Sequence, residues 1–284
     1  MEVLDLHTNS IDGSISTHIG DLDKLQTLRL HTMDISGKIP SEIGLLNELR
    51  HLNLARTSVG GTLPPEIGNC TSLVELEITD TNMTGPVPTT IGGLDKLTKF
   101  WLQRNQLNGT IPTQIGNLTS AKTVMLFLND LTGQIPSEIG FLTAMTRLSI
   151  RSNDLTGQIP EELGDATALL HMWLYGNDLN GTIPTTFGNL AELSLLQMQE
   201  NELTGPIPTQ LGTMTSMTLL DLSYNALRGE IPSQLGGMRR LRVLALQYTQ
   251  LTGRVPIEVS RIRTLRTLTT WGTNVTSGCP LNRC

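Results

Sequence analysis

The chain has 284 residues, of which 38% are hydrophobic and 16% are charged, and it carries a formal net charge of −6 at pH 7. The hydrophobic content excludes a disordered chain, no apolar run is long enough to span a membrane, and three cysteines are too few for a disulfide-rich scaffold. The acidic balance, without basic runs, argues against a nucleic-acid or anionic membrane partner. Only ten residues are aromatic, so the core must be aliphatic.

A 24-residue period runs through the chain and decides the predicted architecture. Glycine recurs every 24 residues from Gly13 to Gly253, and in most repeats proline follows three residues later and a second glycine seven residues later. Upstream of the first glycine, leucines alternate with other residues, as in Leu52 and Leu54. Each repeat therefore predicts one short strand, a turn, an extended Gly-x-Ile-Pro segment and a short helical turn.

A single repeat cannot bury its own apolar face, whereas stacked repeats share one continuous core. We therefore predict an α/β repeat solenoid in which eleven repeats and a partial last repeat form a single domain over residues 1–278, followed by a short C-terminal segment, residues 279–284. At the N-terminal edge, Leu4, Leu6 and Ile11 lie on an uncovered strand. We expect preceding sequence or another chain to cover them.

The repeat Leu-x-Leu-x-x-Asn-x-Leu-x-Gly-x-Ile-Pro-x-x-Ile-Gly-x-Leu, seen well at residues 174–190, resembles the plant-type leucine-rich repeat over residues 2–276. The best-known relatives with this pattern are receptor-kinase ectodomains and secreted polygalacturonase-inhibiting proteins, which are extracellular binding modules. The resemblance implies a right-handed superhelix with a concave parallel β-sheet and short 3-10 turns on the convex side. It also implies an extracellular or cell-surface location, although this chain contains no signal peptide, which leaves a cytoplasmic location open.

The family pattern places an asparagine four residues before each first glycine, where its amide satisfies backbone groups of the turn and of the adjacent repeat. Asn9 and the repeats from Asn105 to Asn225 follow the pattern. The asparagine is replaced nearer the ends by Met33, Thr57, Thr81, Thr249 and Thr273. The central repeats are therefore expected to be the best formed.

In a leucine-rich repeat the non-leucine strand positions face solvent on the concave sheet. Seven of the ten aromatic residues fall on these positions, namely Trp101, Phe127, Trp173, Tyr175, Tyr224, Tyr248 and Trp271. The other three are assigned to the core (Phe100 and Phe187) and to the helical side (Phe141). Exposed aromatic and arginine side chains are enriched at binding hot spots, whereas cross-strand stacking that stiffens the sheet is the alternative explanation.

The candidate ligand-binding residues form an apolar strip with interspersed arginine and glutamine: Trp101, Gln103, Arg104, Met125, Phe127, Arg151, Trp173, Tyr175, Tyr224 and Tyr248. Strand spacing predicts that Trp101 and Trp173 lie roughly 14 Å apart in one column. Met125 and Phe127 add apolar surface that cannot hydrogen-bond to sugars. A peptide or protein ligand is therefore favoured, and a polysaccharide remains an alternative.

No nucleophile elbow, phosphate loop, zinc-protease or kinase motif is present, so we predict no catalytic residue, no cofactor and no enzyme activity. His7, His31, His51 and His171 fall on sheet positions but lack a well-placed carboxylate, and we interpret them as solvated side chains, not as metal ligands. The predicted function is a non-catalytic recognition module that binds a peptide or protein through the concave sheet, as in receptor ectodomains. The alternatives are a secreted inhibitor of a cell-wall-degrading enzyme and a structural or adhesive spacer.

The cysteines and glycosylation sequons indicate in which cellular compartment the protein is expected. By resemblance, Cys279 and Cys284 form a shortened C-terminal cysteine cap with a disulfide, whereas Cys70 replaces a repeat leucine and is expected to be buried. Six Asn-x-Ser/Thr sequons are candidates for the glycans of a secreted glycoprotein: Asn69, Asn82, Asn108, Asn117, Asn180 and Asn274.

Overall fold

The computed structural model describes residues 1–276, and its contacts divide the chain into two compact units. Unit 1 is Met1–Met145 and unit 2 is Thr146–Cys284. The expected disulfide between Cys279 and Cys284 lies outside the described residues. Within residues 1–276 no helix is long and apolar enough to cross a lipid bilayer.

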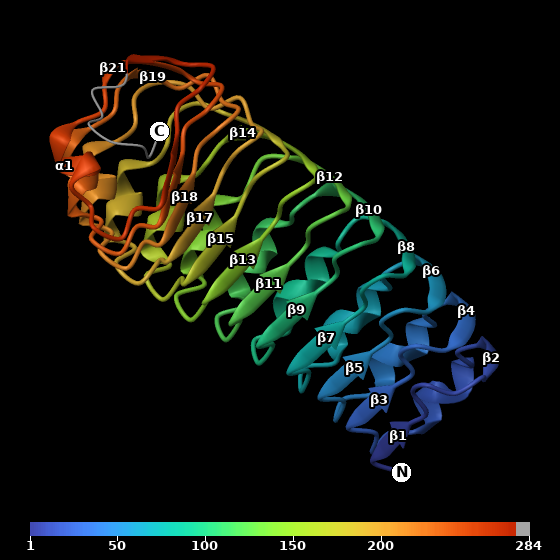
Figure 1. Cartoon of the computed structure of the whole chain (residues 1–284). Coiled ribbons are helices and arrows are strands. Elements are labelled where there is room, and N and C mark those ends of the chain that lie inside the picture. The colour runs from blue at the N-terminus through green and yellow to red at the C-terminus, as the bar shows by residue number, and fades with distance from the viewer. Residues whose placement is uncertain (277–284) are drawn as a thin grey trace. The chain divides into compact units, whose positions relative to one another are not determined.

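Unit 1 is built on a parallel β-sheet with one three-residue strand per repeat, in chain order (Figure 1). Leu28 pairs with Leu52, Leu52 with Leu76, and Leu76 with Phe100, so each strand residue pairs with the residue 24 positions later. The period in the sequence is therefore the strand register itself. The strands are β1 (Val3–Asp5), β3 (Thr27–Arg29), β5 (His51–Asn53), β7 (Glu75–Glu77), β9 (Lys99–Trp101) and β11 (Thr123–Met125).

A second parallel sheet of unit 1 contains the extended segment around each first glycine. Its strands are β2 (Asp12–Ser14), β4 (Asp34–Lys38), β6 (Ser58–Thr62), β8 (Asn82–Gly85), β10 (Gln106–Thr110) and β12 (Asp130–Gly133). A 3-10 helix follows each of these strands: η1 (Thr17–Asp21), η2 (Ser41–Leu45), η3 (Pro65–Asn69), η4 (Thr89–Gly93), η5 (Thr113–Asn117) and η6 (Ser137–Phe141). From η2 to η6 the residue before the helix is the repeat proline, whose fixed φ suits the extended entry.

The two repeated glycines have different physical causes. Gly61 has a φ of +74°, a left-handed conformation that an L side chain rarely adopts. Gly68 lies in η3, where an added Cβ would come within 2.3 Å of the Thr90 carbonyl oxygen in the next repeat. The first glycine is therefore required by backbone conformation and the second by the close stacking of successive 3-10 helices.

Unit 2 continues the same repeat. Its main parallel sheet consists of β13 (Arg147–Ser149), β15 (His171–Trp173), β17 (Leu195–Gln197), β18 (Leu219–Asp221), β20 (Val243–Ala245) and β22 (Thr267–Thr269). Its second set of strands is β14 (Asp154–Gln158), β16 (Asp178–Asn180), β19 (Arg228–Glu230), β21 (Gln250–Arg254) and β23 (Asn274–Thr276). Its helical turns are η7 (Glu161–Asp165), η8 (Thr185–Asn189), η9 (Thr209–Thr213), η10 (Ser233–Gly237) and the α-helical turn α1 (Ile257–Ser260). Each unit is thus a stretch of leucine-rich-repeat solenoid, as the sequence predicts.

The core is aliphatic in both units. Phe100 and Phe187 are completely buried at the predicted core positions, whereas Phe141 at the end of η6 is 59% exposed. Cys70 is also buried, its thiol donates a hydrogen bond to the Ile43 carbonyl, and burial raises the pKa of this thiol to about 11. These four predictions from the repeat pattern are confirmed.

The predicted asparagine ladder is present, and it is more complete in unit 2. Asn177 donates to the carbonyls of Ile150 and Leu174 at 3.2 and 3.0 Å and accepts from the Leu155 N–H at 3.1 Å. Thr57, which replaces the asparagine in unit 1, makes a single bond to the Leu54 carbonyl. Its short side chain satisfies the turn but reaches no neighbouring repeat.

The N-terminal end of the unit 1 core is open to solvent. A recess of about 330 Å³ is lined mainly by apolar side chains, among them Leu4, Leu6 and Ile11. Ile11 is 43% exposed although it occupies a core position of the repeat. The uncovered edge expected from the sequence is therefore present, and what covers it remains a prediction.

Candidate ligand-binding surface

The candidate binding residues lie on the face of each main sheet that points away from the core, which we call the outer face. The strands of this sheet are followed by backbone turns of unusual conformation. Arg104, Leu128, Tyr224 and Tyr248 occupy the same repeat position, and their φ values lie between +51° and +59°. This left-handed conformation costs about 1–2 kcal/mol for an L-residue. It is compensated by hydrogen bonds between repeats, such as those from the Arg104 N–H to the Phe127 carbonyl and from the Tyr224 N–H to the Gln247 carbonyl, both 2.9 Å. The scaffold therefore holds these candidate binding residues in place through the backbone.

In unit 1, Trp101 on β9 lies within a polar network. Its indole Nε1 donates to Thr123 Oγ1 at 2.8 Å, and the Lys99 ammonium lies 4.5 Å from its ring centroid. The same ammonium lies 3.6 Å from Glu75 Oε2 and 4.0 Å from Glu77 Oε2. Burial raises the pKa of the Glu77 carboxyl, and the Lys99 charge opposes this shift. The Trp101 ring is thus partly buried and is held by the hydrogen bond to Thr123 and the contact with Lys99.

A recess of about 360 Å³ lies beside Trp101 on the sheet face of unit 1. Its lining residues come from four successive repeats: His31, Thr32, Asn53, Ala55, Arg56, Glu77, Thr79, Asp80, Trp101 and Gln103. His31, Ala55, Thr79 and Gln103 occupy the same position of four successive repeats and form one column across the sheet. The two central members, Ala55 and Thr79, are small and buried. The small side chains therefore leave a hollow whose rim carries both carboxylates and cations.

The recess brings together two residues that were predicted from the sequence, Trp101 and Gln103, with side chains that were not predicted. Arg104 lies next to the recess and pairs with Asp80 at 3.7 Å between Nε and Oδ1. Met125 pairs with Trp101 across β9 and β11 but does not line the recess, and neither does Phe127, which is partly buried. The small residues Ala55 and Thr79 in one sheet column are the signal that could have located this hollow.

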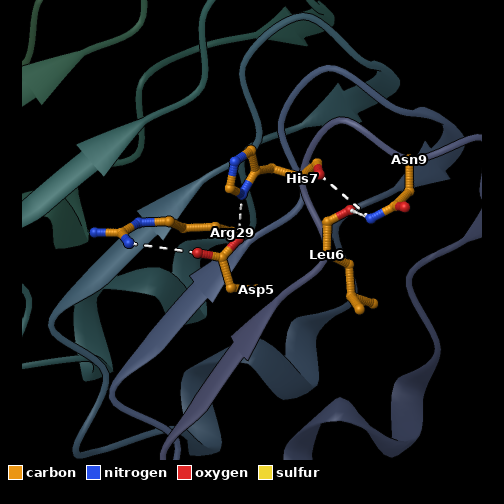
Figure 2. A network of polar contacts seen from close by, with 5 residues as sticks. All are labelled: Asp5, Leu6, His7, Asn9 and Arg29. Atoms are coloured by element: carbon orange, nitrogen blue, oxygen red, sulfur yellow. Dashed lines mark hydrogen bonds and ion pairs between the residues drawn. The ribbon is translucent and has the colours of Figure 1, made fainter.

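The first repeats carry a polar network on the same sheet (Figure 2). Asn9 donates to the Leu6 carbonyl at 2.7 Å, and the Asp5 carboxylate contacts both the His7 ring and, at 3.5 Å, Arg29 Nη1. The hydrogen bond with His7 lowers the pKa of Asp5.

The expectation that these histidines are solvated side chains without a well-placed carboxylate is wrong for two of them, because the His7 ring contacts Asp5 and His51 Nδ1 lies 3.3 Å from Glu75 Oε2. The rings of His7 and His31 are stacked, with centroids 4.5 Å apart and an interplanar angle of 8°. The two histidines lie at the same position of successive repeats, so the strand register places their rings face to face. No group of three or more potential metal ligands is assembled anywhere in residues 1–276.

In unit 2, Trp173 and Tyr175 continue the aromatic set. The His171 ring lies 5.4 Å from Trp173 at an angle of 56°, and the Arg151 guanidinium lies 5.2 Å from the Tyr175 ring centroid. This distance is within the range of a cation–π contact. Burial, assisted by the charge of Arg147, lowers the pKa of His171.

Three exposed rings form a ladder at the C-terminal end of the described sheet. Tyr224 and Tyr248 lie 4.6 Å apart between ring centroids, and Tyr248 meets Trp271 edge-on at the same distance. The three rings are 42%, 47% and 55% exposed. Gly272 makes the ladder possible, because a Cβ there would lie 2.7 Å from the Tyr248 ring. Trp271 therefore belongs with the candidate residues, although it was not predicted from the sequence as a binding residue.

The six glycosylation candidates are all solvent-exposed: Asn69, Asn82, Asn108, Asn117, Asn180 and Asn274. Asn82 lies in β8 and its amide approaches the Ser58 carbonyl at 3.5 Å. Exposure makes each acceptor accessible, and glycosylation itself remains a prediction.

Sequence comparison places the chain among known repeat proteins. A family profile described as a leucine-rich repeat region matches residues 41–157, and a second leucine-rich repeat profile matches residues 168–190 and 216–238. No curated protein sequence matches significantly.

Solved structures with the same fold include two plant receptors. The plant peptide hormone receptor RGFR1 in complex with RGF2 is 32% identical with a TM-score of 0.87, and the match covers 97% of this chain and 48% of that one. The Arabidopsis receptor kinase HAESA in complex with the peptide hormone IDA and the co-receptor SERK1 is 29% identical with a TM-score of 0.93, covering 97% and 46%. The chain therefore spans about half the length of these receptor chains.

A plant ice-binding protein is 28% identical with a TM-score of 0.69, and here the match covers 100% of this chain and 82% of that one. The repeat register, the asparagine ladder and these matches all agree. The chain belongs to the leucine-rich repeat family and resembles the plant receptor ectodomains of that family.

Proposed function

We propose that the chain is a non-catalytic recognition module that binds a peptide or protein ligand through the outer face of its main sheets. The observation that carries the proposal is the placement of every Trp and Tyr on that face in an otherwise aliphatic protein. Aromatic and arginine side chains contribute most to binding free energy at protein interfaces. The receptor neighbours, which are described in complex with peptide hormones, support the same class of ligand and an extracellular location.

Within this proposal the recess beside Trp101 is the anchoring pocket in unit 1. It offers the indole, the Glu77 carboxylate and the side chain of Gln103, whose Oε1 atom is buried without a hydrogen-bond partner. An unsatisfied buried acceptor favours a ligand group that donates a hydrogen bond. In unit 2 the corresponding anchors are Trp173, Tyr175 and the exposed aromatic ladder.

The test uses peptides selected from a random displayed library on the wild-type protein. We expect selected peptides to lose about tenfold or more in affinity for the double variant Trp101→Ala/Trp173→Ala, because hot-spot truncations cost about 2 kcal/mol or more. Phe141→Ala is the matched control, since this ring is exposed on the helical side. Equal affinity for the double variant and the control would refute binding through the sheet face.

The tryptophan substitutions also separate the alternatives, each in its own assay. A structural or adhesive spacer would select no specific peptide, and an inhibitor of a cell-wall-degrading enzyme would reduce polygalacturonase activity in a Trp173-dependent manner. A polysaccharide ligand would instead appear on a glycan array and lose binding in the same double variant. Each outcome points to a different class of ligand for the same surface.

A second candidate function, ice binding, is favoured by one observation on the second sheet. Threonines face each other across adjacent repeats, as in Thr62 with Thr84 and Thr110 with Thr132. Such pairs repeat hydroxyl and methyl groups at the regular spacing of parallel strands, about 4.8 Å. The ice-binding neighbour supports this reading.

Ice-recrystallisation assays test the second candidate directly. If the threonine pairs bind ice, Thr110→Lys/Thr132→Lys abolishes inhibition of recrystallisation while Trp101→Ala/Trp173→Ala leaves it unchanged. A wild-type protein that does not inhibit recrystallisation excludes the second candidate and leaves the first one untouched.

A further inference from the structure

The last repeats of unit 2 differ sharply in charge from the rest of the chain. Residues 228–276 contain eight arginines, two glutamates and no aspartate or lysine, which gives a net charge of +6. The whole chain carries −6, so the remaining residues together carry −12. The average composition conceals this basic segment because the acidic residues of the remaining repeats outweigh its charge.

The fold gathers these arginines into columns. Arg242 and Arg266 occupy the same position of successive repeats, immediately before β20 and β22, and the Arg266 N–H donates to the Arg242 carbonyl at 2.8 Å. Arg239 and Arg263 form a second column in the preceding loops, where Thr264 Oγ1 donates to the Arg239 carbonyl at 2.9 Å. A recess of about 500 Å³ is lined by Arg242, Arg263, Thr264, Leu265 and Arg266.

This arrangement carries an electrostatic cost. Like charges directly opposite each other on adjacent strands are destabilising. All four arginines are exposed, and among residues 1–276 none of them forms an ion pair that would offset the repulsion. An anionic partner would relieve the repulsion, because guanidinium groups bind carboxylates through two parallel hydrogen bonds.

We propose that the recess lined by Arg242, Arg263 and Arg266 binds an acidic peptide segment through two or more of its carboxylates. Stacked repeats place the two strand-edge arginines about 4.8 Å apart, and carboxylates on one face of an extended peptide lie about 7 Å apart, a span that flexible arginine stems can match. The surface is separate from the sheet face of the proposed function, because its arginines precede the strands and line none of the aromatic positions.

The extent of the patch favours a short acidic peptide over larger polyanions. Only two successive repeats contribute to the recess, whereas nucleic acid and anionic bilayers present continuous negative charge over much longer distances. The net charge of −12 on the remaining chain repels such extended partners. Nor does any aromatic ring line the recess, so stacking with nucleic-acid bases is not offered there.

The test is the affinity of the full chain for a fluorescein-labelled deca-glutamate peptide, measured by fluorescence anisotropy. We expect binding that weakens as NaCl is raised from 50 to 500 mM, and a loss of about tenfold in Arg242→Gln/Arg266→Gln. The matched control is Arg50→Gln/Lys96→Gln, which removes the same charge from two exposed residues of unit 1 that do not line the recess beside Trp101. Arg50 occupies the repeat position of Arg242 in unit 1, where no arginine stacks against it. This control and Trp101→Ala/Trp173→Ala keep wild-type affinity.

Three results would overturn the proposal: no binding by the wild type, an equal loss in Arg242→Gln/Arg266→Gln and in Arg50→Gln/Lys96→Gln, or a loss in the tryptophan variant. Tighter binding to polygalacturonate, to a short DNA duplex or to phosphatidylserine vesicles than to deca-glutamate would overturn the acidic-peptide assignment. Thermal unfolding checks the variants, and Arg242→Gln/Arg266→Gln should not lower Tm because it removes like-charge repulsion. Arg263 lies outside any strand, so Arg263→Gln provides an independent variant, which should also weaken the binding of deca-glutamate.

Discussion

The sheet faces of unit 1 and unit 2 differ in chemistry although their repeats are built alike. In unit 1, ion pairs such as Arg29–Asp5, Lys99–Glu75 and Arg104–Asp80 cross the sheet face. In unit 2, ring contacts dominate, from His171–Trp173 to the ladder of Tyr224, Tyr248 and Trp271. Asparagine occupies four of the six ladder positions in unit 2 and three of the six in unit 1, and threonine replaces it at two positions in each unit.

The difference shows that core and surface vary independently in this fold. Leu52 in unit 1 and Leu220 in unit 2 are both buried at the same repeat position and pair with leucines on both sides. The residues that flank them in their strands differ: His51 and Asn53 in unit 1, and Leu219 and Asp221 in unit 2. The core positions supply the stacking free energy, so the outward positions are free to carry either charges or rings. The free energy of unfolding should therefore depend on salt concentration through the side chains of unit 1. In unit 2 it should depend on the aromatic ring contacts.

The largest expected effect concerns the asparagine ladder. Asn177→Ala leaves one buried N–H and two carbonyls without their partner and should lower the free energy of unfolding by about 3 kcal/mol. Thr57→Ala, at an equally buried position of unit 1, removes one hydrogen bond and should cost about 1 kcal/mol. Urea unfolding followed by circular dichroism measures both, and equal losses would contradict the difference between the units.

The next effect concerns the aromatic ladder of unit 2. Tyr248→Ala removes ring contacts with both Tyr224 and Trp271 and should cost about 1–2 kcal/mol. Phe141→Ala, which removes a more exposed ring on the helical side, should cost less than about 0.5 kcal/mol. If chemical denaturation gives the same free energy for both variants, the rings of unit 2 do not stabilise its sheet.

A smaller effect is expected for the ion pairs of unit 1. Lys99→Met removes a charge shared by Glu75, Glu77 and the Trp101 ring and should cost about 1 kcal/mol. Lys24→Met, where the lysine is 62% exposed beside Glu48, should have almost no effect. Unfolding at 50 and 500 mM NaCl provides the check, because only the Lys99 effect should shrink appreciably at high salt.

The smallest effect is a pH dependence that both units share. Burial lowers the pKa of His31 in unit 1 and of His171 in unit 2, so the folded state binds their protons less readily than the unfolded chain. Stability should therefore fall as the pH is lowered through about 6.5. Each of His31→Gln and His171→Gln should reduce the fall in Tm between pH 7.5 and 5.5 by about 1 °C. A wild-type Tm that is constant or rises over this range would contradict the prediction.

Much of the fold was predictable because the 24-residue period is also the strand register. The positions of Phe100, Phe187 and Cys70 in the core follow directly, since every repeat places the same slot in the same environment. The sheet placement of Trp101 and Tyr248 follows for the same reason. The assignment of Cys279 and Cys284 to a disulfide is still a prediction.

The contacts of the candidate site were less predictable. The recess beside Trp101 depends on two small residues, Ala55 and Thr79, in one column of the sheet, and on the larger residues around them. The stacking of His7 on His31 depends on rotamers that satisfy Asp5 at the same time. Side-chain packing of this kind involves neighbours 24 residues away, and its geometry is not encoded by any single repeat.

The sequence by itself determined the repeat, the aliphatic core and the face on which each Trp and Tyr lies, because a strict period leaves each position only one environment. The tertiary structure alone decided which side chains meet across repeats. It placed Lys99 against Trp101, left a hollow above Ala55 and Thr79, and gathered Arg242, Arg263 and Arg266 around one recess. The physical reason is that parallel strands bring residues 24 positions apart to within about 5 Å, so local charge and shape depend on several repeats together.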